Sequence, residues 1–141
     1  MKRARLLLPA LLFMAGTGAC GPSEPVRCEL WRVCLLGSEK SSCVTAAPER
    51  TRLDVELAGY GFYRAYSVDL DSASDPEPVG QFRAWLGGVP LQQVELVDDS
   101  PQQQVLTGTL PDGLGRGVYG ARVVTPAGCR AELPDAVRIG E

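Results

Sequence analysis

Hydrophobic and polar residues alternate over several short stretches of this chain. In the clearest stretch, acidic residues separate Leu53, Val55 and Leu57. Successive side chains of a strand point to opposite faces of a sheet, so this alternation predicts a strand with one buried and one exposed face. Similar short patterns predict further strands over residues 82–86, 94–97, 104–110, 117–124 and 136–139.

Turn-forming residues separate these stretches. Gly87-Gly88 follows residues 82–86, and two glycines with positive φ form the shortest kind of hairpin turn. About seven short strands at close spacing, without an amphipathic helical pattern, predict an all-β fold, a β-sandwich. Further turns are expected over residues 98–101, 111–113, 125–128 and 133–135.

The first 19 residues have a different pattern. Three basic residues precede an apolar run from Leu6 to Ala15, and small residues follow at positions 16–19. This order is typical of a secretory signal peptide. The apolar run is about half of the roughly 20 residues that a transmembrane helix needs, so we do not expect a permanent span.

The end of this signal resembles the lipobox of bacterial lipoproteins, because Thr17-Gly18-Ala19 places small residues directly before Cys20. The resemblance implies cleavage before Cys20 and attachment of lipid to its thiol. Two or three acyl chains anchor a protein stably to a membrane. Gly21 stands where an aspartate often retains such proteins on the inner membrane, which favours the outer membrane. The alternative is an ordinary signal peptide with Cys20 in a disulfide.

Charge and composition restrict the function of the mature chain. Without residues 1–19, 122 residues remain, with 11 basic and 17 acidic side chains and a net charge of −6. This acidity argues against a nucleic-acid partner, which needs a basic face. The chain contains no histidine, the commonest general base and metal ligand. No nucleophile has an evident base beside it, so we expect no catalytic residues and no enzyme activity.

Four cysteines follow Cys20 in the sequence. An even number of cysteines in an exported chain predicts two disulfides, and three pairings are open. Zinc is the alternative, but the spacings lack the close Cys-x2-Cys pairs of zinc ribbons. The four are Cys28, Cys34, Cys43 and Cys129.

Two further patterns are weaker. Residues 115–120 spell Gly-x-Gly-x-x-Gly, but β-branched residues follow where a dinucleotide site requires a helix. An acidic stretch could attract calcium, although its spacing does not match an EF-hand loop, and a solvated loop is the simpler interpretation. We therefore expect no metal and no cofactor. The acidic residues are Asp69, Asp71, Asp75 and Glu77.

The chain thus divides into four parts. Residues 1–19 form the signal peptide, and residues 20–27 form a tether that contains two prolines. Residues 28–42 form a cysteine-bearing segment, for which a strand with a turn and a short helix are both open. Residues 43–141 form the β-sandwich.

Residues 43–139 resemble the IPT/TIG domain, an immunoglobulin-like fold. The matching motifs are Gly-Tyr-Gly-Phe at 59–62, Leu-Gly-Gly at 86–88, Leu-Pro at 110–111, Gly-Val-Tyr at 117–119, Val-Val-Thr-Pro-Ala-Gly at 123–128, and Leu-Pro-Asp-Ala-Val at 133–137. The resemblance implies a Cys43–Cys129 disulfide and, for the remaining pair, Cys28–Cys34. It also places Tyr119 like the tyrosine corner of immunoglobulin-type sandwiches, whose hydroxyl bonds to a nearby backbone group.

Trp85 is the most interesting candidate for binding. The alternation that turns Ala84 and Leu86 inward turns Trp85 outward, beside Arg83. An exposed tryptophan with a neighbouring guanidinium group can hold a peptide or a sugar ring. The alternative is that Trp85 covers a neighbouring strand or packs with Trp31 under the cysteine-bearing segment.

Together these features predict a non-enzymatic lipoprotein of the cell envelope. Its partners are the membrane, through the lipid anchor, and a protein or a glycan that contacts the immunoglobulin-like domain. Two alternatives are an accessory subunit of an envelope complex without a ligand of its own, and a carbohydrate-binding module.

Overall fold

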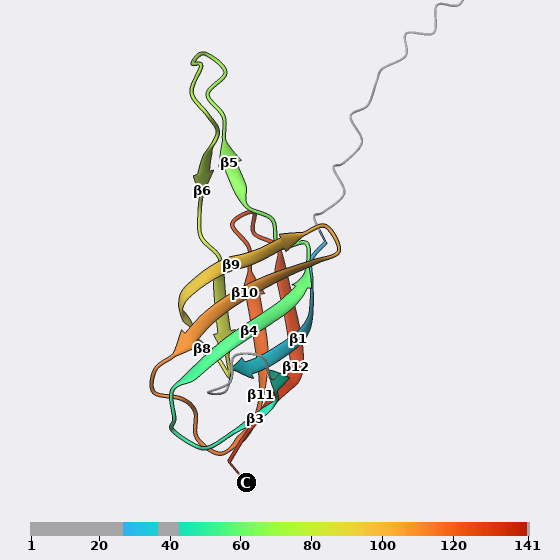
Figure 1. Cartoon of the computed structure of the whole chain (residues 1–141), viewed down its shortest axis with the longest axis vertical. Helices are drawn as coiled ribbons and strands as arrows, with labels where there is room; N and C mark the ends of the chain where they lie inside the picture. Colours follow the sequence, from blue (N-terminus) through green and yellow to red (C-terminus); the bar gives the residue numbers. More distant parts are fainter. Residues whose placement is uncertain (1–26, 37–42, 141) are drawn as a thin grey trace, which may run out of the picture.

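The computed structural model describes residues 27–36 and 43–140, and this part of the chain is all-β, without a helix. Two five-stranded sheets face each other, and a separate two-stranded hairpin projects from one end (Figure 1). The first sheet has the order β2 (Cys43–Val44), β1 (Glu29–Leu36), β4 (Leu53–Tyr60), β10 (Gln103–Leu110), β9 (Gln92–Ser100). The second has the order β3 (Ala46–Ala47), β12 (Arg130–Ile139), β11 (Gly117–Val124), β7 (Arg83–Leu86), β8 (Val89–Pro90).

The space between the two sheets is filled by apolar side chains. Leu57 and Leu106, from the first sheet, and Leu86 and Val123, from the second, are each 0% exposed. These are the inward positions of the alternating stretches, so the strands that the pattern predicts also supply the core. The prediction of a β-sandwich is therefore confirmed.

The predicted hairpin at Gly87-Gly88 is also confirmed. Both glycines have positive φ, 59° and 79°, and β7 and β8 pair on either side of them. Gly87 lies so close to Tyr119 that a Cβ atom would stand 2.5 Å from Cδ1 of the tyrosine ring. The turn therefore needs glycine at position 87 for space as well as for conformation.

The cysteine-bearing segment contributes a strand to the sandwich. β1 pairs with β4 along its whole length, and Leu30, Val33 and Leu35 are buried. The pairing contains a bulge between Leu30 and Arg32, so Trp31 interrupts the alternation. This interruption explains why periodicity alone did not distinguish a strand from a helix.

Two other parts differ from the predicted pattern. The turn expected over residues 133–135 is an irregularity within β12, where Asp135 has a φ of 50°. The acidic stretch belongs to a hairpin, because β5 (Ala65–Ser67) and β6 (Glu77–Val79) pair on either side of it. Both strands are only three residues long and mostly exposed, so they have no hydrophobic pattern that would predict them.

The predicted disulfide pairing was wrong, although all four cysteines are paired. The bonds are Cys28–Cys129 and Cys34–Cys43, with Cα–Cα distances of 6.1 and 4.7 Å. β1 and β2 are antiparallel neighbours, and Cys43 on β2 lies opposite Leu36 on β1. Cys34, two residues before Leu36 on the same strand, is therefore close enough to bond to Cys43. The segment before β1 then carries Cys28 to the start of β12, and the Cys28–Cys129 bond joins the two sheets.

Tyr119 makes the contact that its position predicted. Its hydroxyl donates a hydrogen bond to the carbonyl oxygen of Gly115, at 3.1 Å. This bond ties the loop before β11 to the strand itself, which is the arrangement of a tyrosine corner.

Candidate functional site

Trp85 lies on the outer face of the second sheet, as the alternation predicts. Ala84 and Leu86 are buried beside it, while Trp85 is half-buried. The guanidinium carbon of Arg122, on β11, lies 4.4 Å from the centroid of the Trp85 ring, and that of Arg83 lies 5.7 Å away. Arg122 is opposite Trp85 in the β7–β11 pairing, so the sheet register holds the ring and the cation together.

The two arginines around Trp85 carry unneutralised charge. The ion pairs found among the described residues are Arg32–Glu56 and Arg52–Asp54, on or beside β4. Glu132 is opposite Arg122 in the β11–β12 pairing but forms no ion pair with it. The Nε atom of Arg122 is buried without a hydrogen-bond partner.

A hollow of about 640 Å³ adjoins this cluster. Arg83 and Trp85 line it from the second sheet, and Gln93 and Glu95 line it from β9 of the first sheet. The hollow therefore opens between the edges of the two sheets. It offers an indole ring and guanidinium, amide and carboxylate groups to one ligand.

The other sequence candidates do not form a site in the described part of the chain. Trp31 is on the first sheet, so it does not pack with Trp85. The acidic residues of the β5–β6 hairpin are exposed, and Asp69 accepts a hydrogen bond from the backbone of Asp71. No group of three or more potential ligands that could hold a metal ion occurs among the described residues. Most of the Gly-x-Gly-x-x-Gly pattern lies within β11, and no helix follows it.

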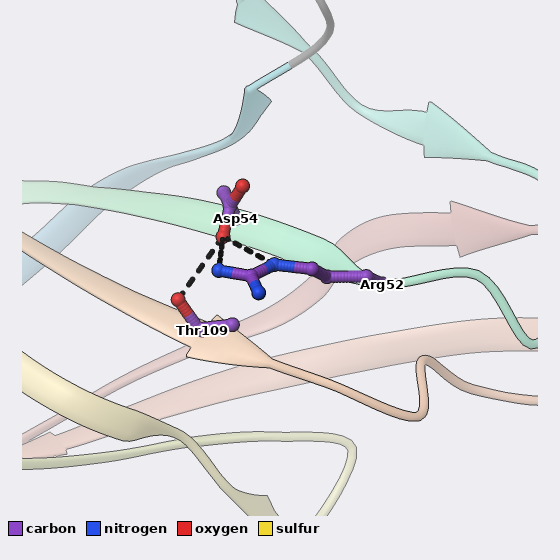
Figure 2. A network of polar contacts seen from close by, with 3 residues as sticks. All are labelled: Arg52, Asp54 and Thr109. Carbon is purple, nitrogen blue, oxygen red and sulfur yellow. Dashed lines mark hydrogen bonds and ion pairs between the residues drawn. The ribbon is translucent and has the colours of Figure 1, made fainter.

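The polar network on the first sheet has a structural role. One carboxylate oxygen of Asp54 accepts hydrogen bonds from the Nε and Nη2 atoms of Arg52, both at 3.3 Å, and from the Thr109 hydroxyl at 3.0 Å (Figure 2). Thr109 is opposite Asp54 in the β4–β10 pairing. The carboxylate is thus occupied in joining two strands, as expected for a cross-strand pair.

A second cluster contains three exposed aromatic residues, Trp31, Tyr60 and Tyr63, which the sequence analysis did not identify as a site. The Trp31 and Tyr60 rings are nearly parallel, with centroids 6.4 Å apart and an interplanar angle of 11°. The Tyr60 and Tyr63 rings are nearly perpendicular, with centroids 6.2 Å apart. The three side chains are 48%, 40% and 43% exposed, respectively. We name these three residues the aromatic cluster.

The aromatic cluster is held by a buried clamp. Gln104 is 1% exposed, and its Oε1 atom accepts hydrogen bonds from the backbone N–H groups of Gly61 and Phe62 at 2.8 and 3.3 Å. Its Nε2 atom donates to the carbonyl oxygen of Ser100 at 2.7 Å. Gly61 has a φ of 80°, which favours glycine. The Gly-Tyr-Gly-Phe motif is therefore a fixed turn with one tyrosine in it and another after it.

Tyr60 and Asp99 influence the ionisation of Tyr63. A side-chain hydrogen bond with Tyr60, together with partial desolvation and the nearby Asp99 carboxylate, raises the pKa of Tyr63 above 10.0. Each of these effects disfavours the phenolate. The Tyr63 hydroxyl is therefore neutral throughout the physiological pH range.

Cys20, the predicted lipidation site, lies outside the described residues. Within those residues, no helix has the length and apolarity needed to cross a bilayer. No protein-family model matches this chain, and no curated protein is similar to it.

Proposed function

We propose that this protein is a non-enzymatic lipoprotein of the cell envelope, anchored through Cys20, whose immunoglobulin-like domain of the IPT/TIG type contacts another protein. The signal peptide with its lipobox supports the anchor and, with Gly21, an outer-membrane location. The tyrosine corner at Tyr119 supports the immunoglobulin-like assignment.

The observation that carries the contact function is the cluster of Trp85, Arg83 and Arg122 beside the hollow. Tryptophan and arginine are the residues most enriched at the energetic centres of protein interfaces. Neither arginine has a carboxylate partner in the described part of the molecule, so an acidic segment of a partner would complement them.

A protein ligand fits this cluster better than a glycan. Sugar rings bind tryptophan by lying against its open face, and the guanidinium group of Arg122 lies against the Trp85 ring at 4.4 Å. A sugar would have to displace that contact, whereas an acidic side chain can bind the outer edge of the guanidinium group. This difference favours protein contact over the carbohydrate-binding alternative.

Affinity purification from detergent-solubilised envelopes tests the contact. We expect a partner that is recovered with the lipidated protein and lost with Trp85→Ala. Tyr66→Ala is the matched control, because Tyr66 is an exposed aromatic residue on the separate hairpin. Equal recovery with both variants, or glycan binding that depends on Trp85, would contradict protein contact at this site.

Labelling with radioactive palmitate tests the anchor separately. We expect the unaltered protein to incorporate label and Cys20→Ser to incorporate none. Both disulfides should form in the Cys20→Ser variant, because all four of their cysteines belong to the folded domain. If Cys20→Ser disrupts the disulfides, Cys20 has a structural role instead.

A further inference from the structure

The aromatic cluster has open ring faces. The two cation–π contacts found in the described part of the chain both involve Trp85, so no arginine there lies over Trp31, Tyr60 or Tyr63. Arg64 follows Tyr63 directly, but its Nη2 atom donates to the carbonyl oxygen of Leu96 at 3.3 Å. Trp31 and Tyr60 stack on each other, so a ligand can reach only the outer parts of the rings, which leave the three side chains 40–48% exposed.

Two carboxylate groups lie beside the cluster. Glu29 accepts a hydrogen bond from the indole nitrogen of Trp31 at 3.1 Å, and Asp99 lies close enough to act on Tyr63. Neither carboxylate belongs to an ion pair of the described residues. The hairpin that leaves the sandwich at this end carries more exposed acidic residues (Figure 1): Asp69, Asp71, Asp75 and Glu77.

The geometry of the cluster is set before a ligand arrives. Glu29 is opposite Tyr60 in the β1–β4 pairing, and the bulge in β1 turns Trp31 toward Tyr60. The clamp by Gln104 fixes the turn that leads from Tyr60 to Tyr63. A preformed site loses little conformational freedom on binding, which favours affinity.

We propose that the aromatic cluster binds a lysine or arginine side chain of a basic protein segment. The negative faces of the three rings attract a cation, and the most favourable rings for this are those of tryptophan and tyrosine. The unpaired carboxylates of Glu29 and Asp99 add attraction of the same sign. This site is on the first sheet, separate from Trp85, and it does not depend on the anchor or on the partner at Trp85.

Binding of a synthetic peptide tests this proposal. The probe is a nine-residue peptide of alternating glycine and lysine, and the protein is the mature chain in non-ionic detergent with Trp85→Phe. The chain contains two tryptophans, so this variant leaves Trp31 as the single tryptophan emitter. We expect a saturable change in Trp31 emission that weakens with salt, and no change with a peptide of alternating glycine and glutamate.

Variants locate the peptide on the cluster. Tyr60→Ala should weaken binding about two- to fivefold, because it removes the ring that contacts both others and a cation–π contact at an exposed site contributes about this factor. Glu29→Gln, which leaves every ring in place, should weaken binding less, and the control Tyr66→Ala should not change it. The same peptide with trimethyllysine in place of lysine should bind at least as tightly as the lysine peptide, because methylation keeps the positive charge. The proposal is overturned if Tyr60→Ala binds as the unaltered cluster does, or if the glutamate peptide binds equally.

Discussion

Removing each disulfide should destabilise the domain by a different and calculable amount. The Cys28–Cys129 bond closes a loop with a sequence separation of 101, and the Cys34–Cys43 bond closes one of 9. A cross-link stabilises mainly by restricting the unfolded chain, and this effect grows with the logarithm of the loop length. The first bond should then contribute about 4.7 kcal/mol to the free energy of unfolding and the second about 2.6 kcal/mol.

Equilibrium unfolding in urea measures this difference. Residues 21–141 contain all four cysteines, and the two double variants are Cys28→Ala with Cys129→Ala, and Cys34→Ala with Cys43→Ala. We expect the first to lose about 2 kcal/mol more than the second. An equal loss, or a larger loss in the second variant, would contradict this prediction, and so would non-reducing peptide mapping that found Cys43 joined to Cys129.

Three other predictions concern the turns and the aromatic cluster. Gln104→Leu leaves the backbone donors of the Gly-Tyr-Gly-Phe turn unpaired, so it should lower the free energy of unfolding in urea by about 1–3 kcal/mol. The control Gln102→Leu, at an exposed position, should change it little. Gly88→Ala should lower the free energy of unfolding by about 1 kcal/mol, because the residue has a positive φ. Gly87→Ala should lower it clearly more, because the added Cβ atom also clashes with the Tyr119 ring. Equal losses in the two variants would contradict this close contact. In an NMR titration that resolves the Tyr63 ring signals, Tyr63 should ionise above pH 10.0, and Tyr60→Phe should bring its pKa down toward that value. Because the pKa of Tyr63 is raised in the folded state, the stability that this shift contributes is complete below pH 10.0 and is lost as the pH rises through the folded pKa. An unchanged Tyr63 pKa in Tyr60→Phe would contradict the hydrogen bond.

Hydrophobic alternation predicted the central strands well, because their inward residues meet the core directly. Leu53, Val55 and Leu57 are all buried, and β11 covers the predicted residues 117–124. The same pattern placed Trp85 outward. It could not show Arg122 beside Trp85, because that contact depends on the register between two strands far apart in the sequence.

The first strand shows where local pattern is insufficient. The bulge at Trp31 breaks the alternation, so β1 did not stand out as a member of the sheet. The disulfide prediction failed for the same reason, since Cys28 reaches Cys129 when β1 is part of the sandwich. The aromatic cluster likewise depends on the pairing of Glu29 with Tyr60, which no spacing in the sequence reveals.

We propose above all that a lipid at Cys20 anchors this domain to the envelope. Mass spectrometry of the N-terminal peptide of the mature protein, isolated from membranes, tests it most directly. We expect a chain that begins at Cys20 and carries a diacylglycerol group on its thiol, with an acyl group on the new amine. A mature chain with an unmodified Cys20, or with Cys20 in a disulfide, would contradict it.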